Sequence, residues 1–237
     1  MPDKLHIVSF SGGKDSTATL LMMLEKGIKV DRIINVDTTK EFPQMYDHIK
    51  KVEAFIGREI ETIKIDFDYW FSEHVKTKGK RKGTKGYGWP DFRNRWCTAL
   101  KREAFSYALA NKDYDPHKRG IAVIEYHGIA VDEEKRLNKN KDGRDIRFPL
   151  AEWNVTEAQA LQYCFDKGSD WGGLYSEGRS RVSCFCCPLQ RINELRLTHK
   201  NHSLLWDNMR AMDGVSFRKF RSDYSLVELE EKFNKEE

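Results

Sequence analysis

The chain has 237 residues, with 41 Lys and Arg against 37 Asp and Glu, five Cys and 12% aromatic residues. A chain of this length buries more than about two thirds of its unfolded surface, and the aromatic residues supply large core side chains. These values exclude an intrinsically disordered chain and a disulfide-rich secreted scaffold. They favour one large domain, or one domain with an appendage.

The net charge of +4 is concentrated in one short segment. Residues 76–85, KTKGKRKGTK, contain six basic residues and no acid. Elsewhere 35 basic residues face 37 acidic ones. The sequence therefore predicts a near-neutral body that carries one positive segment, which is the first candidate for contact with an anionic partner.

Neither a secretion signal nor a membrane span is expected. The first ten residues contain an acid and no long apolar stretch. The most apolar run, residues 18–24, is far shorter than the ~20 residues that cross a bilayer. A small, odd number of Cys favours a reducing compartment. We therefore expect a cytoplasmic protein in which clustered Cys serve metal binding or catalysis.

The first third of the chain alternates short apolar runs with helical spacing. Strands are expected at residues 5–10, 30–36 and 59–65, and helices at residues 16–26 and 44–55. This order predicts an α/β fold with an open parallel sheet of about five strands and helices on both faces.

The rest of the chain is less regular. The expected elements are a loop (66–95), a helix (98–110), a strand (120–129), a polar loop (132–145), a helix (157–167), a connector (172–188) and one or two helices (193–212). We expect a nucleotide-binding domain over residues 1–190 and a helical C-terminal extension over 191–237, so that the sheet is followed by a Cys-bearing, mainly helical C-terminal portion.

One motif lies between the first strand and the first helix. It reads Ser11-Gly12-Gly13-Lys14-Asp15-Ser16. Two glycines let the backbone turn tightly and direct its N–H groups at an anion, and the following helix N-terminus favours negative charge. Lys14 adds a positive charge and the serines add donors. A capped helix start is the plain alternative, but the full motif in this setting favours phosphate binding.

SGGKDS resembles the pyrophosphate-binding loop of the adenine-nucleotide alpha-hydrolase superfamily, which includes N-type ATP pyrophosphatases and phosphoadenosine phosphosulfate (PAPS) reductases. Further blocks resemble the PAPS reductase branch and follow its order over about residues 5–190. They are Asp37-Thr38-Thr39 with Phe42-Pro43, Arg95-Trp96-Cys97-Thr98 with Lys101, Gly128 with Asp132-Glu133 and Arg136, Pro149-Leu150 with Trp153, and residues 178–188.

The resemblance implies roles for these residues. The loop would hold the nucleotide phosphates, with Asp37, Thr38 and Gly128 nearby at the carboxyl edge of the sheet, where open α/β folds bind ligands. Asp37 would contact adenine, ribose or Mg²⁺, and a turn carboxylate is its alternative. The catalytic candidates are Lys14, Asp15, Lys101 and Arg136. For Lys101 the alternative is a surface lysine, and for Arg136 it is a solvated ion pair.

Cysteines gather in a second motif, Cys184-Phe185-Cys186-Cys187-Pro188. Together with Cys97 they give four thiols, the ligand number of a 4Fe–4S cluster or a structural zinc. Adjacent cysteines suit different irons of one cluster better than a single zinc, and sulfur-handling relatives carry such clusters. We therefore expect an iron–sulfur cluster first. The next alternatives are a zinc site with Cys97, Cys184, Cys187 and His199 or His202, and then a bare dithiol. Cys164 is expected to be an ordinary buried cysteine.

The basic segment is followed by aromatic residues. The charges of Lys78, Lys80, Arg81, Lys82 and Lys85 would meet phosphates, and the rings of Tyr87, Trp89, Phe92 and Trp96 would stack on bases. This composition makes a nucleic-acid contact a hypothesis. A flexible solvated loop, or closure over the phosphates of the bound nucleotide, are the alternatives.

These features together predict an adenine-nucleotide-dependent enzyme of sulfur chemistry. It would cleave ATP between the α and β phosphates with Mg²⁺ and adenylate an acceptor for sulfur transfer. The alternatives are a PAPS or adenylyl sulfate reductase that yields sulfite, and a non-catalytic nucleotide- or nucleic-acid-binding accessory module. The segment after Cys187 lacks the nucleophilic Cys of thioredoxin-dependent PAPS reductases, which favours the first reading. A sulfur- or electron-donor protein and a homodimeric partner are compatible with the resemblance.

Overall fold

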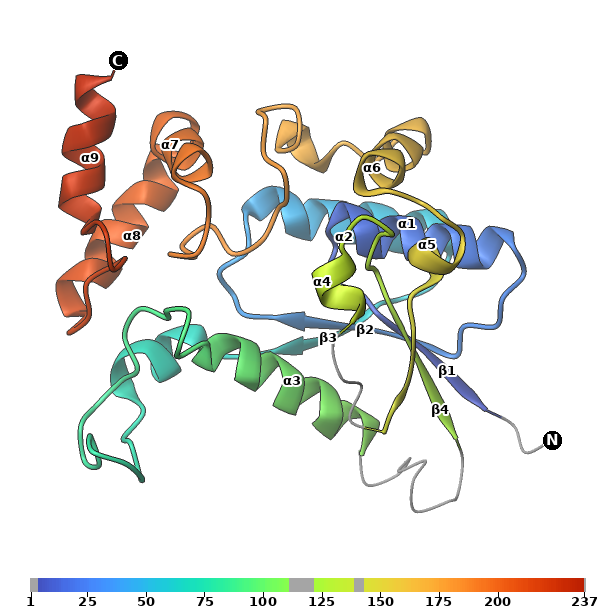
Figure 1. Ribbon diagram of the computed structural model, residues 1–237, viewed down its shortest axis with the longest axis horizontal. Coiled ribbons are helices and arrows are strands. Elements are labelled where there is room, and N and C mark those ends of the chain that lie inside the picture. Colours follow the sequence, from blue (N-terminus) through green and yellow to red (C-terminus); the bar gives the residue numbers. More distant parts are fainter. Residues whose placement is uncertain (1–3, 111–121, 139–142, 237) are drawn as a thin grey trace.

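A computed structural model describes residues 4–110, 122–138 and 143–236. At its centre lies a five-stranded sheet of order β3-β2-β1-β4-β5, in which every neighbouring pair is parallel (Figure 1). The expected α/β fold with an open parallel sheet is confirmed. The strands are β1 (Leu5–Ser9), β2 (Arg32–Asp37), β3 (Glu61–Lys64), β4 (Val123–His127) and β5 (Asp145–Arg147).

Strand β1 is the centre of the sheet and its side chains fill the core on both faces. Ile7 and Val8 are fully buried. β1 pairs with β2 on one side and with β4 on the other. The chain adds β2 and β3 on one side of β1 and then crosses to the other side for β4 and β5, so the strand order reverses at β1. In open α/β sheets the ligand binds at such a switch point, outside the carboxyl ends of the strands. The loop after β1 therefore lies where the fold binds its ligand.

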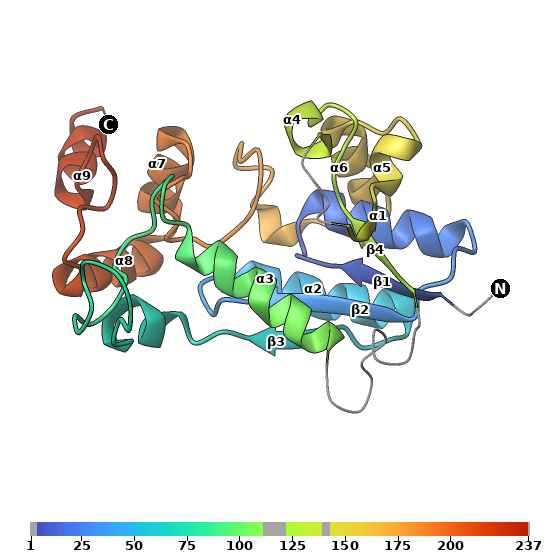
Figure 2. The ribbon, with the colours of Figure 1, turned by 60° about the horizontal axis from the view of Figure 1, so that its bottom comes forward.

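Helices cover both faces of the sheet (Figures 1 and 2). On one face, α3 (Trp96–Leu109) packs Phe105 and Leu109 against Ile7 and Ile34. On the other face, α1 (Lys14–Glu25) and α2 (Pro43–Ile56) pack against β1, β2 and β4. The sheet domain also contains the helices α4 (Glu134–Leu137), α5 (Pro149–Glu152) and α6 (Glu157–Asp166), with a 3₁₀ turn η2 (Trp171–Gly173) after α6.

The structure contains four elements where the sequence predicts loops. A π-helical turn η1 (Tyr69–Glu73) and an antiparallel bridge between Val75 and Lys85 lie within the expected loop 66–95. Helix α4 lies within the expected polar loop 132–145, and strand β5 begins at the last residue of that loop. Both α4 and β5 are too short and too polar to show a hydrophobic period. Residues 120 and 121 of the expected strand 120–129 lie outside the described residues.

Three further helices follow the sheet domain: α7 (Ile192–Asn201), α8 (Ser203–Val215) and α9 (Leu226–Lys235). Their buried side chains, such as Trp206 and Phe233, belong to one apolar cluster that also contains Ala18 and Trp89. The helices thus share a continuous core with the sheet domain. A domain boundary at residue 190 stays a prediction. Among the described helices, none has the length and apolar character needed to span a bilayer.

Candidate functional site

The loop between β1 and α1 makes a tight turn at the carboxyl end of the central strand. Gly12 has a φ of +76°, a conformation that favours glycine, and α1 begins directly after Gly13. The Ser16 hydroxyl accepts a hydrogen bond from the backbone N–H of Ser11 (3.2 Å) and donates one to the carbonyl of Gly13 (3.0 Å). These bonds hold the loop closed around the N-terminus of α1, whose first N–H groups lack partners within the helix.

Gly128, which follows β4, lies against this loop. A Cβ atom at position 128 would lie 2.6 Å from the carbonyl carbon of Asp15 and from the nitrogen of Ser16. Only a residue without a side chain permits this close contact of two backbones. The resemblance assigned Gly128 to nucleotide binding, and the geometry gives it the further role of seating α1 against the end of β4.

Lys14 is buried and paired. Its Nζ lies 2.6 Å from Oε1 of Glu157 and 2.9 Å from Oδ2 of Asp15, and only 4% of the residue is exposed. Burial alone would lower the pKa of Lys14, but the two carboxylates outweigh it and raise that pKa. The Lys14 charge is thus compensated by the protein. A phosphate at the loop would have to compete with Glu157 for it.

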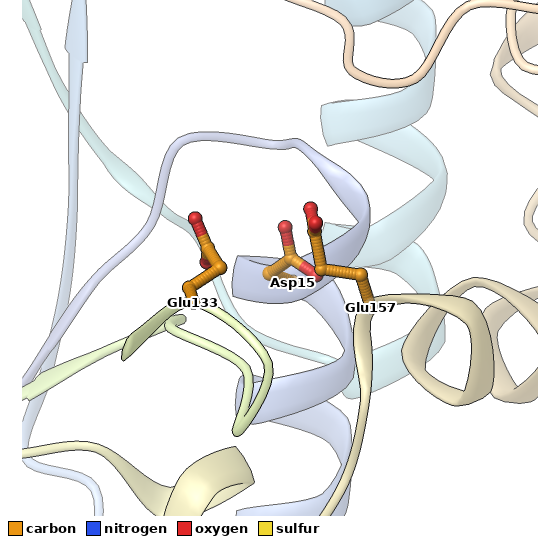
Figure 3. Close-up of side chains that lie close together, drawn as sticks. All are labelled: Asp15, Glu133 and Glu157. Carbon is orange, nitrogen blue, oxygen red and sulfur yellow. The ribbon is translucent and has the colours of Figure 1, made fainter. Parts of the chain in front are cut away.

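Three carboxylates meet beside the loop. Ligand oxygens of Asp15, Glu133 and Glu157 all lie within 4.8 Å of one another, and they come from α1, the turn before α4, and the start of α6 (Figure 3). Burial, together with the neighbouring charges of Glu157 and Glu133, raises the pKa of Asp15 despite the opposing effect of Lys14. Among the described residues this is the one group of three with metal-ligand spacing. Carboxylate oxygens are the ligands that Mg²⁺ prefers.

Two of these carboxylates were not among the predicted site residues. Glu133 belongs to a block that resembles the family, but no sequence feature separates it from its neighbour Asp132. Glu157 follows the helix cap Thr156, where an acid is explained by the helix dipole alone. Only the fold brings both beside Asp15.

The connector after α6 closes over the loop from the other side. The indole N–H of Trp171 donates to the carbonyl of Gly12 (2.7 Å), and the hydroxyl of Tyr175 accepts from the backbone N–H of Lys14 (3.0 Å). Trp171 also stacks on His48 of α2, with 4.4 Å between ring centroids. Sequence reasoning missed these contacts, although large aromatic residues in a glycine-rich connector were a signal for them.

Asp37 is buried at the end of β2 and already has two partners. Its Oδ1 accepts from the backbone N–H of Thr39 (2.6 Å) and from the hydroxyl of Tyr46 (3.1 Å). Burial and the Asp37 charge raise the pKa of Tyr46. Asp37 thus fixes the turn in which Thr39 takes a φ of +61°. These contacts favour the turn carboxylate over a nucleotide or metal ligand.

A second polar cluster lies beyond this turn. Oε1 of Glu41 accepts from Nζ of Lys101 (3.1 Å) and from the hydroxyl of Thr38 (3.3 Å), and it lies 3.4 Å from Sγ of Cys184. Lys101 is therefore not a free surface lysine. Its pKa is raised because Glu41, Cys184 and Cys97 outweigh the cost of its burial. Sequence reasoning missed Glu41, which no motif distinguished from other acids.

The cysteines of the two motifs lie close together around this cluster. Cys97 acts electrostatically on Cys187, and Lys101 acts on both Cys97 and Cys184. Cys186 lies deeper, with 1% exposed. Burial raises the pKa of all four thiols. For Cys97, burial outweighs the opposing effect of the nearby Lys101 charge on its pKa.

The thiols are not spaced as the ligands of a single zinc ion would be. Two sulfurs on one zinc lie at most about 4.6 Å apart, since each Zn–S bond is about 2.3 Å. Among the described residues no three cysteines meet a 4.8 Å spacing. His202 instead binds Glu177 (3.0 Å), and His199 packs against Trp206.

The two remaining single predictions have plain outcomes. Arg136 is half-exposed and pairs with Glu133 three residues earlier (2.5 Å), which is the ion pair named as its alternative. Cys164 is fully buried, and its thiol lies 3.4 Å from the carbonyl of Lys14, as expected of a core cysteine.

The basic segment forms an ordered hairpin. Backbone bonds join Lys76 to Thr84 (3.0 Å) and Gly83 to Lys76 (2.8 Å). Lys85 pairs with Glu73, whereas Lys78, Lys80, Arg81 and Lys82 are exposed at the tip. Figures 1 and 2 show the hairpin beside α8 and away from α4, which borders the SGGKDS loop (residues 11–16). These contacts disfavour both a flexible loop and closure over the bound nucleotide.

The profile of the phosphoadenosine phosphosulfate reductase domain matches residues 5–190, which is most of the chain. The chain belongs to this family. The match covers the loop, the Asp37 turn and all four clustered cysteines, and it ends before α7. The resemblance drawn from SGGKDS and the ordered blocks is thereby confirmed.

Individual relatives of this PAPS reductase family chain are distant. An uncharacterized protein of Methanocaldococcus jannaschii is 25% identical over 202 residues, which are 85% of this chain and 40% of that protein. The chain thus spans two fifths of the length of this curated relative.

Two solved structures show weaker similarity. One is the U34-tRNA thiolase NcsA from Methanococcus maripaludis with its 4Fe–4S cluster (14% identity, 90% of this chain and 72% of the other, TM-score 0.46). The other is the PAPS reductase from Candida auris in a phosphate complex (19% identity, 78% and 82%, TM-score 0.44).

Proposed function

We propose that this PAPS reductase family chain cleaves ATP between the α and β phosphates, adenylates an acceptor, and uses its clustered cysteines in the sulfur transfer that follows. A cytoplasmic location belongs to the same proposal. A sulfide-level sulfur from a donor protein would then form a bond to the activated carbon of the acceptor as the bond from that carbon to the AMP oxygen breaks, and AMP would leave.

One observation carries the proposal: the phosphate loop and the thiols are joined by a single short segment. A Cβ atom at Gly13 would lie 3.8 Å from the carbonyl oxygen of Val182. Two residues later, Sγ of Cys184 lies 3.1 Å from the hydroxyl of Thr38. An acceptor activated at the loop would therefore be within reach of the thiols without leaving the edge of the sheet.

The residues divide the work. The N–H groups at the start of α1 and the Lys14 charge would stabilise the leaving pyrophosphate, which is electrostatic catalysis by groups already oriented. Glu157 and Asp15 hold Lys14 in place until a phosphate competes for it. Lys101 and Glu41 would set the charge beside Cys184 during the sulfur step.

The cofactors follow from the donor sets. Asp15, Glu133 and Glu157 offer the oxygens for Mg²⁺, whose charge would offset that of the phosphates. Cys97, Cys184, Cys186 and Cys187 would hold a 4Fe–4S cluster, which supplies sulfur or electron chemistry when bound.

The family match favours a second candidate, reduction of PAPS or adenylyl sulfate to sulfite. The two candidates differ in substrate and product. Purified protein is incubated without oxygen, in parallel, with ATP and Mg²⁺ and with PAPS and a dithiol. Pyrophosphate from ATP supports the proposal, and sulfite from PAPS supports the second candidate. Tight nucleotide binding with neither product would support an accessory module and contradict both.

A further inference from the structure

We propose that a groove between the basic hairpin and the C-terminal helices binds single-stranded nucleic acid, the acceptor class for the reaction above. The inference rests on the proposed function for its purpose but on separate residues for its argument. The groove has a volume of about 390 Å³ and lies between residues 89–92 and residues 218–223. It also reaches Arg81 of the hairpin and Pro188-Leu189, directly after Cys187. We call this the basic groove.

Charge is the first argument. The lining contains four cations, Arg81, Arg218, Lys219 and Arg221, and two acids, Asp91 and Asp223. Arg218 pairs with Asp91 (2.5 Å) and Arg221 with Asp223 (2.8 Å), so the acids hold the arginines in place. The exposed lysines at the hairpin tip add positive charge at the rim. A polyanion that runs along this path would meet cations at repeated intervals.

Exposed rings are the second argument. Phe92 in the lining is 75% exposed, and the guanidinium of Arg95 lies 5.6 Å from its ring centroid. Phe217, which is 48% exposed, has Lys76 and Arg81 each 4.5 Å from its ring centroid. Aromatic rings and arginine planes among cations form the stacking platforms that proteins offer to unpaired bases. A duplex keeps its bases stacked inside, so these rings favour a single strand.

The groove walls are firmly connected to each other and to the thiols. The indole N–H of Trp89 donates to Asp213 of α8 (2.7 Å), and its ring packs edge-on against Phe220. On the far side, Nη1 of Arg221 donates to the carbonyls of Pro188 (2.6 Å) and Gln190 (2.9 Å). One wall is therefore bonded to the segment that carries Cys184–Cys187. A strand held in the groove would present its bases next to the proposed sulfur site.

The test measures binding in the absence of ATP. Fluorescence anisotropy is recorded with labelled 20-nucleotide single strands of RNA and of DNA, with the matching duplexes, and with poly-glutamate as a polyanion without bases. We expect the wild type to bind a single strand more tightly than it binds the duplex or poly-glutamate. The comparison of RNA with DNA shows which of the two nucleic acids the groove prefers. The association constant should fall as the salt concentration rises. In a plot of log association constant against log salt concentration, the slope should be about −0.7 for each phosphate contacted.

Two variants and two matched controls locate the site. Phe92→Ala should weaken single-strand binding about five-fold or more through lost stacking, and Arg81→Glu about ten-fold with a shallower salt slope. Phe55→Ala removes a 62% exposed Phe on α2, and Lys50→Glu reverses an exposed charge on the same helix. Both controls should bind like the wild type. Thermal unfolding of every variant shows that it is folded.

Three outcomes would overturn the proposal: no single-strand binding by the wild type, equal affinity for poly-glutamate, or equal losses in the groove variants and their controls. Pyrophosphate release from ATP is measured separately. If ATP is cleaved and nucleic acid is not bound, the groove proposal fails and the proposed function stands. If nucleic acid is bound at the groove and ATP is not cleaved, the proposed function fails instead.

Discussion

At the scale of single residues, Lys14 is the buried cation of the SGGKDS loop. Its ammonium is buried and held by Asp15 and Glu157, so the protein keeps a cation at the end of β1 and compensates its charge. A buried charge without a partner would be costly. A phosphate that bound Lys14 would displace the Glu157 carboxylate from it. Nucleotide binding would therefore be linked to the position of Glu157.

Replacement of Lys14 tests this role. Lys14→Met should lower the rate of pyrophosphate release at least ~100-fold, because a preoriented charge that stabilises the leaving group contributes on this order. A coupled pyrophosphate assay measures the rate. Lys50→Met removes a lysine from the exposed surface of α2 and should leave the rate unchanged. Similar rates in the two variants would remove Lys14 from the mechanism.

His48 gives the fold a pH dependence. Its Nε2 lies 3.1 Å from the Thr17 hydroxyl, and burial lowers the pKa of His48 to about 4, against about 6.5 in the unfolded chain. Below pH 6.5 the unfolded chain takes up a proton that the folded chain does not. The free energy of unfolding should therefore fall by about 2 kcal/mol from this residue between pH 7.5 and pH 5.

Urea unfolding at both pH values measures this effect. His48→Gln keeps a polar side chain but cannot titrate, so it should lose about 2 kcal/mol less than the wild type over the same interval. Equal losses in the two proteins would show that His48 is not held neutral by the fold.

At the scale of elements, the site depends on how closely α1 approaches the end of β4. Gly128→Ala would put a methyl group against the backbone of Asp15 and Ser16. We expect a destabilisation of about 1–3 kcal/mol and weaker nucleotide binding, because overpacking would displace the start of α1. Calorimetry with ATP and thermal unfolding measure the two effects.

Gly214 provides the matched control for this prediction. It lies within α8, and a Cβ atom there would meet nothing within 4 Å. Gly214→Ala should leave ATP binding unchanged and raise stability by up to about 1 kcal/mol, since Ala favours a helix more than Gly does. If Gly128→Ala behaved in the same way, the close contact between β4 and α1 would not matter for the site.

The elements also show what the sequence could predict. Long apolar runs and helical spacing located β1 to β4 and helices α1, α2, α3, α6, α7 and α8 to within a few residues, because burial on one or both faces imposes those periods. Helix α9 was expected only as part of a helical extension over 191–237. Strand β5 and helix α4 carry too few apolar residues to show a period. Glu157 and Glu41 could not be predicted as site residues, because only tertiary contacts bring them to the SGGKDS loop and the cysteines. Trp171 and Tyr175 carried a signal as large aromatic residues in a glycine-rich connector, but the sequence does not say what they contact.

At the scale of the whole molecule, the net charge of +4 belongs to a hairpin that packs on the C-terminal helices. The C-terminal part is joined to the sheet domain by a continuous core and by the bond from Trp89 to Asp213. The molecule thus combines the SGGKDS loop at the centre of its sheet, thiols beside it, and a basic groove that extends from the thiols to the periphery.

The thiols predict a measurable metal content. Protein prepared without oxygen should contain about four iron and four sulfide per chain and absorb visible light, as a 4Fe–4S cluster does. Cys184→Ser should lower both contents, whereas Cys164→Ala, which changes a core cysteine away from the cluster, should keep them. Zinc in place of iron would contradict the cluster.

The central claim is that the loop cleaves ATP at the α–β bond, separately from the chemistry of the thiols. ³¹P NMR of ATP, Mg²⁺ and single-stranded nucleic acid as acceptor, incubated anaerobically with the wild type and with Cys184→Ser, tests it most directly. The account predicts similar amounts of pyrophosphate from both proteins, because the thiols act only in the later step that frees AMP from the acceptor. Formation of ADP and phosphate, or unchanged ATP with the wild type, would contradict it.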